Sequence, residues 1–141
     1  MLTEKVLYRA QVKATAGRDI RAVSSDGVLD LTVTRPRELG GANGPGTTSE
    51  HLFAASYAAS FLDVMRLVAG RESVSLPRNT EVEASVGVGP TARSLGIEVE
   101  LRIWLPGLPR AEADLLVEKS DALCPYSNAM RGNVSVRLVF A

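Results

Sequence analysis

The segment of residues 49–65, SEHLFAASYAASFLDVM, constrains the fold more than any other stretch of the chain. It is apolar almost all round, which predicts a helix whose first half is buried on all sides. We expect Thr48 or Ser49 to be the N-cap and the helix to end at Ala69, before Gly70. The small side chains in this helix are Ala54, Ala55, Ser56, Ala58, Ala59 and Ser60. They leave room for a second helix to pack closely against it in the middle of the molecule.

Alternation of apolar and polar residues predicts strands on both sides of this helix. The expected strands cover residues 6–14, 20–25, 28–35, 82–88, 97–105 and 133–140. Residues 36–50, rich in Gly and Pro, should form a long loop, and residues 111–123 a second, amphipathic helix that ends at Cys124 and Pro125. This order of elements predicts an α+β fold with mostly antiparallel sheet, as a single domain over residues 1–141.

Composition excludes several classes of function. The 16 basic and 16 acidic residues cancel, so no net field attracts nucleic acid or an anionic membrane. One His and one Cys cannot supply the roughly four ligands of a typical zinc site, so we expect no metal. A single Cys excludes an internal disulfide and suits a reducing compartment. We see no signal peptide and no run near the ~18 apolar residues of a membrane helix, which favours a soluble, cytoplasmic protein.

Three polar residues are candidates for chemistry, and each also has a plain structural explanation. Cys124 at a helix end fits a small buried apolar residue, and the local sequence gives no reason for high reactivity. Arg18 in the turn AGRD fits a solvated charge, and Glu50 in the first helical turn fits the helix dipole. If Glu50 is buried it needs a cationic partner, and Arg18 could bind it through two hydrogen bonds.

Ser60 is a serine in the middle of the apolar helix. A catalytic serine needs a base, and the sole histidine, His51, lies nine positions earlier. On a helix this separates the two by about 13 Å along the axis, on different sides, so a Ser–His pair would need a second subunit. Taken from the residues alone, Ser60 is a packing residue and the function stays undetermined.

Several motifs along the whole chain resemble the organic hydroperoxide resistance proteins, a branch of the OsmC/Ohr family. They are ATAGRD, AVSSDG, PRELGG, GPGT, EHLFAASYAASF, VGVGP, LPGL and, most specific of all, CPYSNAMRGN. The resemblance implies an OsmC/Ohr-like fold with antiparallel sheets, two central helices and an intertwined homodimer. The two active sites would then lie at the subunit interface.

The resemblance also implies a thiol peroxidase that reduces organic hydroperoxides, often those of fatty acids, to alcohols. A peroxidatic Cys becomes a sulfenic acid, a resolving Cys forms a disulfide with it, and lipoylated protein or another dithiol reduces the pair, with no bound cofactor. Arg18 matches the family's Arg beside the peroxidatic thiolate, Glu50 the carboxylate that holds this Arg, and Cys124 the resolving Cys. The expected substrate entrance is lined by Tyr126, Phe53 and Phe61.

The family's peroxidatic Cys falls on Ser60. Oxygen has no accessible sulfenic state, so we expect the chain to be inactive or impaired as a peroxidase. Ser60 is either an introduced Cys-to-Ser substitution or natural divergence. Departures from the family at Ala16, Ser56 and the run TSEH favour divergence, whereas the retained Arg18, Glu50 and Cys124 favour substitution. A lipid-binding or redox-sensing paralogue that uses the same pocket, and a structural partner in mixed dimers, are the rival functions.

Overall fold

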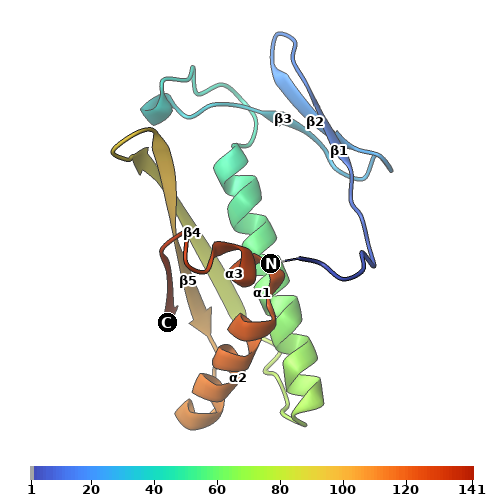
Figure 1. Ribbon diagram of the computed structural model, residues 1–141, viewed down its shortest axis with the longest axis vertical. Coiled ribbons are helices and arrows are strands. Elements are labelled where there is room, and N and C mark those ends of the chain that lie inside the picture. Colours follow the sequence, from blue (N-terminus) through green and yellow to red (C-terminus); the bar gives the residue numbers. More distant parts are fainter. Residues whose placement is uncertain (1) are drawn as a thin grey trace. The chain divides into compact units, whose positions relative to one another are not determined.

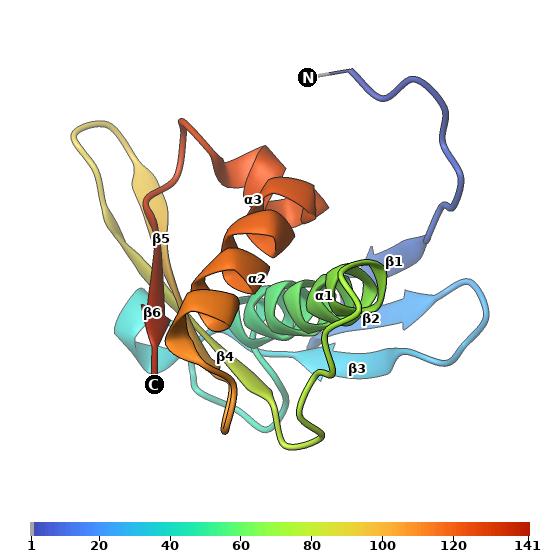
Figure 2. The same cartoon turned by 90° about the horizontal axis from the view of Figure 1, so that it is seen from below.

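The computed structural model describes residues 2–141. The chain forms two compact units, Met1–Ser49 and Glu50–Ala141, and each is described by itself. Figure 1 labels the helices α1–α3 and the strands β1–β5, and Figure 2 labels β6 as well. Both units contain a three-stranded sheet, and the second also contains the long helices, so the α+β class predicted from the sequence is confirmed.

The N-terminal unit is an antiparallel sheet of three short strands in the order β1-β2-β3. Their bounds are Val12–Thr15 for β1, Ile20–Ser24 for β2 and Asp30–Val33 for β3. Asp26 forms the turn between β2 and β3, because its carboxylate accepts hydrogen bonds from the Ser24 hydroxyl at 2.6 Å and the Val28 amide at 3.0 Å. Gly27 follows with φ of 74°, which glycine adopts without strain. The segment SDG, residues 25–27, therefore forms the turn that joins the two strands.

This unit has almost no core of its own. Residues 2–21 are all exposed, and within residues 2–49 Ala22 alone has a buried side chain. The prediction of a half-buried strand over residues 6–14 is therefore wrong for this chain by itself. A strand needs a neighbour to bond with, and β2 is long enough to pair only with residues 12–15. The rest of the unit is a loop that contains the short 3-10 helix η1, Arg37–Leu39.

Helix α1, Ser49–Arg71, begins where the sequence predicts, which places Thr48 at the N-cap position. Its buried residues are Tyr57, Phe61, Met65, Val68 and Ala69, all on one face. The prediction that its first half is buried on all sides is wrong for one chain, because Ala55, Ser56 and Ala59 are exposed. These three small residues share one face of α1, and no other element of the C-terminal unit covers that face within the described residues 50–141.

The end of α1 also differs from the prediction. Gly70 lies inside the helix, and the residue with left-handed backbone is Ser73, with φ of 55°. The amide of Val74 bonds to the carbonyl of Ala69 at 2.8 Å, and the amide of Ser73 to that of Gly70 at 3.4 Å. These two bonds form a Schellman motif, in which Val74 turns back onto the core.

Replacing Ser73 by glycine should therefore stabilise the protein. A side chain at left-handed φ is strained, and its removal is expected to raise the free energy of unfolding by about 0.5–1 kcal/mol. Urea unfolding of Ser73→Gly measures this gain. Ser73→Ala is the matched control, because it keeps the β-carbon and should give none of it.

The sheet of the C-terminal unit has the order β4-β5-β6. Strands β4, Glu81–Pro90, and β5, Leu95–Trp104, form an antiparallel hairpin close to the predicted bounds. Strand β6, Val136–Phe140, runs parallel to β5, which is the exception to the mostly antiparallel sheet expected. Two helices lie between β5 and β6, and such a crossover is what allows neighbouring strands to run in the same direction.

The core of this unit lies between its sheet and helices α1 and α2. Figure 2 shows both helices on the same face of the sheet. Helix α2, Arg110–Leu123, contributes Ala113, Leu116 and Val117, whose spacing places them on one helical face. Strand β5 is central, and its inward side chains are the most deeply buried of the sheet. They are Val99, Leu101 and Ile103.

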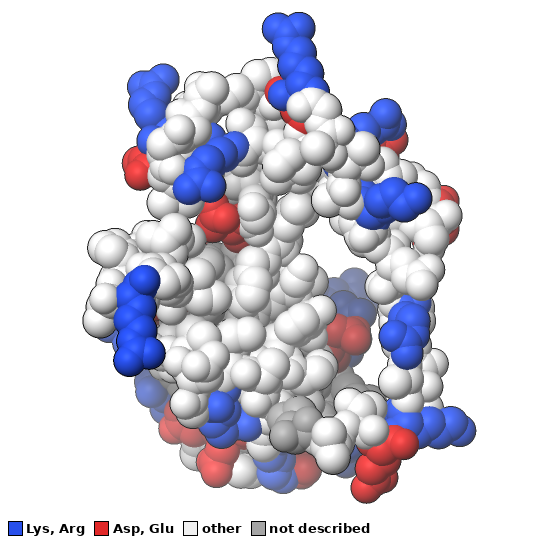
Figure 3. All heavy atoms as spheres, turned by 45° about the horizontal axis from the view of Figure 1, so that its top comes forward, with Lys and Arg blue, Asp and Glu red and all other residues white. Residues whose placement is uncertain are grey.

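Acidic and basic side chains are interspersed on the face drawn in Figure 3, as the balanced charge predicts. In length and composition α1 is apolar enough to cross a membrane. The expectation that no such segment exists is therefore wrong by that criterion. One such helix is weak evidence, because core helices of soluble proteins meet the same criterion.

Candidate functional site

Ser60 and Cys124 lie side by side in the C-terminal unit. The Oγ atom of Ser60 on α1 is 4.0 Å from the Sγ atom of Cys124. Cys124 is fully buried and unoxidised, whereas Ser60 is partly exposed. Residues 64 positions apart in the sequence therefore place a hydroxyl and a thiol in contact, with the hydroxyl on the more open side.

Cys124 occupies the junction of two helices. Its amide donates to the carbonyl of Ser120 at the end of α2, and its own carbonyl accepts from the amide of Asn128 in α3, Pro125–Met130. Pro125 is the first residue of α3, a position that suits proline because no helical partner is needed for its nitrogen. The sequence predicted the end of α2 here but not the short helix that follows. Cys124 is thus fixed by backbone bonds on both sides.

A second contact between α1 and α3 lies next to the first. The hydroxyls of Tyr57 and Ser127 are 2.7 Å apart and both side chains are buried. Burial raises the pKa of Tyr57 above its usual value, although the hydrogen bond between Tyr57 and Ser127 opposes this shift. The ring of Tyr57 also packs against Phe53, edge on, with centroids 6.5 Å apart, and against Tyr126 at 6.1 Å.

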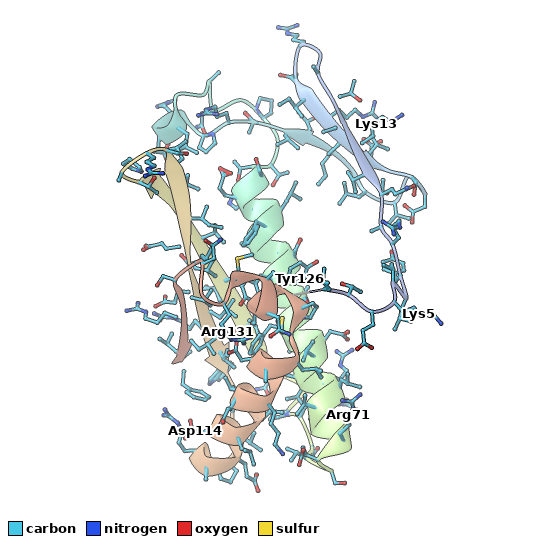
Figure 4. The ribbon with its side chains drawn as sticks, viewed as in Figure 1. Lys5, Lys13, Arg71, Asp114, Tyr126 and Arg131 are labelled. Carbon is cyan, nitrogen blue, oxygen red and sulfur yellow. The ribbon has the colours of Figure 1, made fainter. Side chains whose placement is uncertain are left out.

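Arg131, at the end of α3, ties this segment back to α2. Its Nη2 atom donates to the main-chain carbonyl of Asp121 at 3.1 Å and to its carboxylate at 3.3 Å, and its Nη1 atom donates to the side chain of Asn128. Figure 4 labels Arg131 and Tyr126 on this segment. Because Asp121 and Arg131 bracket Cys124, their contacts hold the turn that carries the thiol.

Sequence reasoning missed Tyr57, Ser127 and Arg131 as parts of this site. A usable signal was present, because Tyr57 precedes Ser60 by three residues and Ser127 follows Cys124 by three. Residues three apart lie on the same helical face, so the contact of Ser60 with Cys124 brings the other pair together. Without knowledge that these two segments meet, however, each spacing is ordinary.

The other predicted residues occupy different places. Arg18 is exposed in the turn between β1 and β2 of the N-terminal unit, whereas Glu50 is partly buried in the first turn of α1. The predicted pairing of Arg18 with Glu50 joins two units and stays a prediction. Glu50 and Ser60 are ten positions apart on one continuous helix, so about 15 Å of helix axis separates them. His51 is likewise nine positions from Ser60 on that helix, as the sequence predicted.

The three aromatic residues predicted at the substrate entrance differ in exposure. Tyr126 is 41% exposed and Phe53 is partly buried, and both contact the ring of Tyr57. Phe61 is fully buried among core residues, which gives it a packing role that the sequence did not indicate. Their contact with a substrate stays a prediction.

Within residues 2–141 no cluster of three or more His, Cys, Asp or Glu side chains could hold a metal ion. A cavity of about 230 Å³ lies beside Tyr57 and Ser127. Its remaining lining residues are Asp121, Arg131, Gly132, Val134, Val136 and Leu138. The site therefore consists of the Ser60 hydroxyl in contact with the Cys124 thiol, the buried hydroxyl pair of Tyr57 and Ser127, and a small cavity beside that pair.

The chain is similar to known proteins over most of its length. The OsmC-like protein family matches residues 40–139. An organic hydroperoxide resistance protein of Xanthomonas axonopodis pv. citri is 52% identical over 138 residues, which cover 98% of this chain and 97% of the relative. The crystal structure of such a protein from Elizabethkingia anophelis, with thiocyanate bound, superposes with a TM-score of 0.91 at 41% identity, covering 97% of this chain and 98% of that one. That of OhrB from Bacillus subtilis has a TM-score of 0.86 at 36% identity, with 96% and 100% covered.

Proposed function

Because this chain belongs to the OsmC family, in the branch of the organic hydroperoxide resistance proteins, we propose that it has the scaffold of a thiol peroxidase for organic hydroperoxides, with Ser60 at the peroxidatic position. The observation that carries this proposal is the contact of 4.0 Å between Ser60 and Cys124. A peroxidatic and a resolving residue must meet in this way, because they form a disulfide in each catalytic cycle.

With a thiol at position 60 the chemistry balances as follows. The thiolate attacks one oxygen of the hydroperoxide, an S–O bond forms, the O–O bond breaks, and the alcohol leaves with a proton. The sulfenic acid is then attacked by the Cys124 sulfur, which forms the disulfide and releases water. A dithiol such as a lipoyl group reduces the disulfide by exchange and becomes a disulfide itself. A hydroxyl at position 60 cannot enter the first step.

Arg18 and Glu50 complete the proposed site as part of a homodimer. About 15 Å of helix separates Glu50 from Ser60 of the same chain, so a site that uses both draws them from two subunits. Two further features support a dimer. The N-terminal sheet lacks a core within one chain, and the small residues of α1 present an uncovered face. Both surfaces would be buried by a second copy.

Partners and location follow from the same proposal. The reductant is a lipoylated protein or another dithiol, the substrate is an organic hydroperoxide, and the compartment is the cytoplasm. The chain has no net charge to attract nucleic acid, and its single buried thiol suits a reducing environment.

Ser60 itself favours one alternative. As it stands, the chain places a hydroxyl where the chemistry needs a thiol, which fits a paralogue that binds lipids or their hydroperoxides, or senses redox state, without reducing them. Titration of the unaltered chain with a fluorescent fatty acid separates the two. Saturable binding together with an inactive Ser60→Cys variant would favour the binding function.

The direct test is disulfide formation in the Ser60→Cys variant. One equivalent of cumene hydroperoxide should remove both of its thiols and lower the mass of each subunit by two hydrogens, because the two side chains already lie in contact. Free thiol counts and intact mass under non-reducing conditions report this. The unaltered chain should keep its single thiol. Two free thiols in the treated variant would contradict the proposed function.

A further inference from the structure

We propose that the buried hydrogen bond between Tyr57 and Ser127 positions Cys124 against residue 60 and so sets the rate of the disulfide-forming step. This inference rests on the proposed function and deepens it, since it assigns a role to two residues outside the reacting pair. Both residues act through Cys124 and neither touches the reacting atoms.

The two contacts between α1 and the Cys124 segment form adjacent pairs. Tyr57 lies one helical turn before Ser60, and Ser127 lies one turn after Cys124. Side chains three residues apart on a helix are about 5–6 Å apart, so the hydroxyl pair lies directly beside the reacting pair. Any shift of α3 relative to α1 that breaks the hydrogen bond at 2.7 Å also changes the separation of 4.0 Å beside it.

The hydroxyl pair is suited to fix that separation because it is shielded from water. Tyr57 is 1% exposed and Ser127 4% exposed, so bulk solvent has little access to either side chain. A buried polar group left without a partner is costly, which makes one arrangement of the two helices strongly preferred. A hydrogen bond between two exposed side chains would not favour one arrangement of the helices in this way, because water could replace either partner.

Other contacts of α3 do not replace this bond. Arg131 and the Cys124 amide bind the segment to α2, through Asp121 and Ser120 respectively. The ring of Tyr126 also contacts that of Tyr57, with centroids 6.1 Å apart, but ring contacts tolerate a wide range of separations and fix α3 against α1 less tightly than the hydrogen bond. The cavity of about 230 Å³ beside Tyr57 and Ser127 gives α3 room to move once the bond is lost. Loss of the hydroxyl pair should therefore loosen Cys124 relative to α1 and leave the rest of the fold in place.

The test separates the two chemical steps in the Ser60→Cys background. Attack on the hydroperoxide does not involve Cys124, whereas closure of the disulfide does. Tyr57→Phe and Ser127→Ala should each slow disulfide formation by about tenfold or more, because misplacement of a reacting group by about 1 Å can cost about 100-fold. The rate of sulfenic acid formation, followed with a dimedone-type probe, should be unchanged. The double variant should be no slower than the slower single variant, since both remove the same bond.

Ser120→Ala is the matched control. Its hydroxyl is as buried as that of Ser127, but it donates within its own helix to the carbonyl of Leu116 at 2.7 Å. It loses a buried hydrogen bond of similar kind without loosening α3 from α1. Disulfide formation in this variant should match the parent, which distinguishes positioning from a general loss of stability.

Oxidation by diamide gives the same comparison without a hydroperoxide. Diamide takes up the two thiol hydrogens as the disulfide forms, so its rate reports how closely the thiols are held even if the parent variant proves unreactive toward hydroperoxides. Slower disulfide formation with diamide in Tyr57→Phe and Ser127→Ala supports the proposal, whether or not the parent Ser60→Cys variant reacts with hydroperoxides. Equal rates in the parent and both variants would overturn it and leave the proposed function untouched.

Discussion

Replacing Ser60 by cysteine is expected to give a chain that consumes cumene hydroperoxide with dihydrolipoamide as reductant, at more than about 10³ times the rate of the unaltered chain. An alcohol is far less acidic than a thiol, whose pKa is about 8.5. Its oxygen also cannot take up an oxygen atom from the hydroperoxide as the sulfur of a thiolate does when it becomes a sulfenic acid. The contact that the catalytic cycle needs is already present, because the Cys124 sulfur lies 4.0 Å from the side chain at position 60.

Two controls define what this activity means. Ser60→Ala should be as inactive as the unaltered chain, which shows that the gain comes from the thiol. Cys124→Ser in the Ser60→Cys background should react once with the hydroperoxide but fail to turn over with the dithiol, since no disulfide can form. Turnover by the unaltered chain at the same rate as the Ser60→Cys variant would contradict the proposal and make Cys124 a peroxidatic thiol by itself. Inactivity of the Ser60→Cys variant would show that the site has diverged beyond position 60.

Replacing Leu101 by alanine is expected to have the largest effect on stability. Leu101 is fully buried on the central strand β5, between its register partners Ala84 on β4 and Leu138 on β6. Removal of a buried leucine loses its transfer free energy and leaves a cavity, so the free energy of unfolding should fall by about 2–5 kcal/mol. Since a typical domain has only about 5–15 kcal/mol, this variant should unfold at much lower urea concentration.

Leu95→Ala is the matched control for this prediction. Leu95 lies on the same strand but is 57% exposed, so the same atoms are removed from a position already in contact with water. Its effect should stay within about 0.5 kcal/mol. Both variants are compared at one protein concentration, because the proposed dimer would make apparent stability depend on it. Similar losses in the two variants would show that Leu101 is not part of the main core.

Elements with long alternation were predicted well from the sequence. Strands β4 and β5 were placed within two residues at each end, because each carries a full set of alternating side chains over ten residues. The strand expected over residues 6–14 was wrong because alternation indicates which face of a strand would be buried and not that a partner strand exists. Within the described residues 2–141, only the end of this segment pairs, as β1 with β2. The parallel direction of β6 depends on the path of the connection and not on the strand's own pattern.

The candidate site was predictable only in part. Ser60 and Cys124 were identified by resemblance to a family, since neither a serine in an apolar helix nor a lone cysteine indicates a partner by itself. Helix α3 is too short to show a period, so its contacts were missed. Tyr57 reads in the sequence as one more aromatic residue of the core, and its hydroxyl gains meaning only from Ser127, 70 residues away.

The crossover between β5 and β6 has a consequence for how this protein can vary. The segment that contains α2, Cys124 and α3 is anchored at both ends in neighbouring strands of one sheet, paired from Val99 with Val136 to Ile103 with Phe140. The segment is therefore an insertion between two strands whose pairing fixes the positions of its ends. A corresponding segment from a relative could be exchanged as one piece while the sheet stays unchanged. The inner faces of α2 and α3 would then have to pack against the same core residues. Cys124, Ser127 and Arg131 would then be inherited together, whereas their partners Tyr57 and Ser60 would stay on α1.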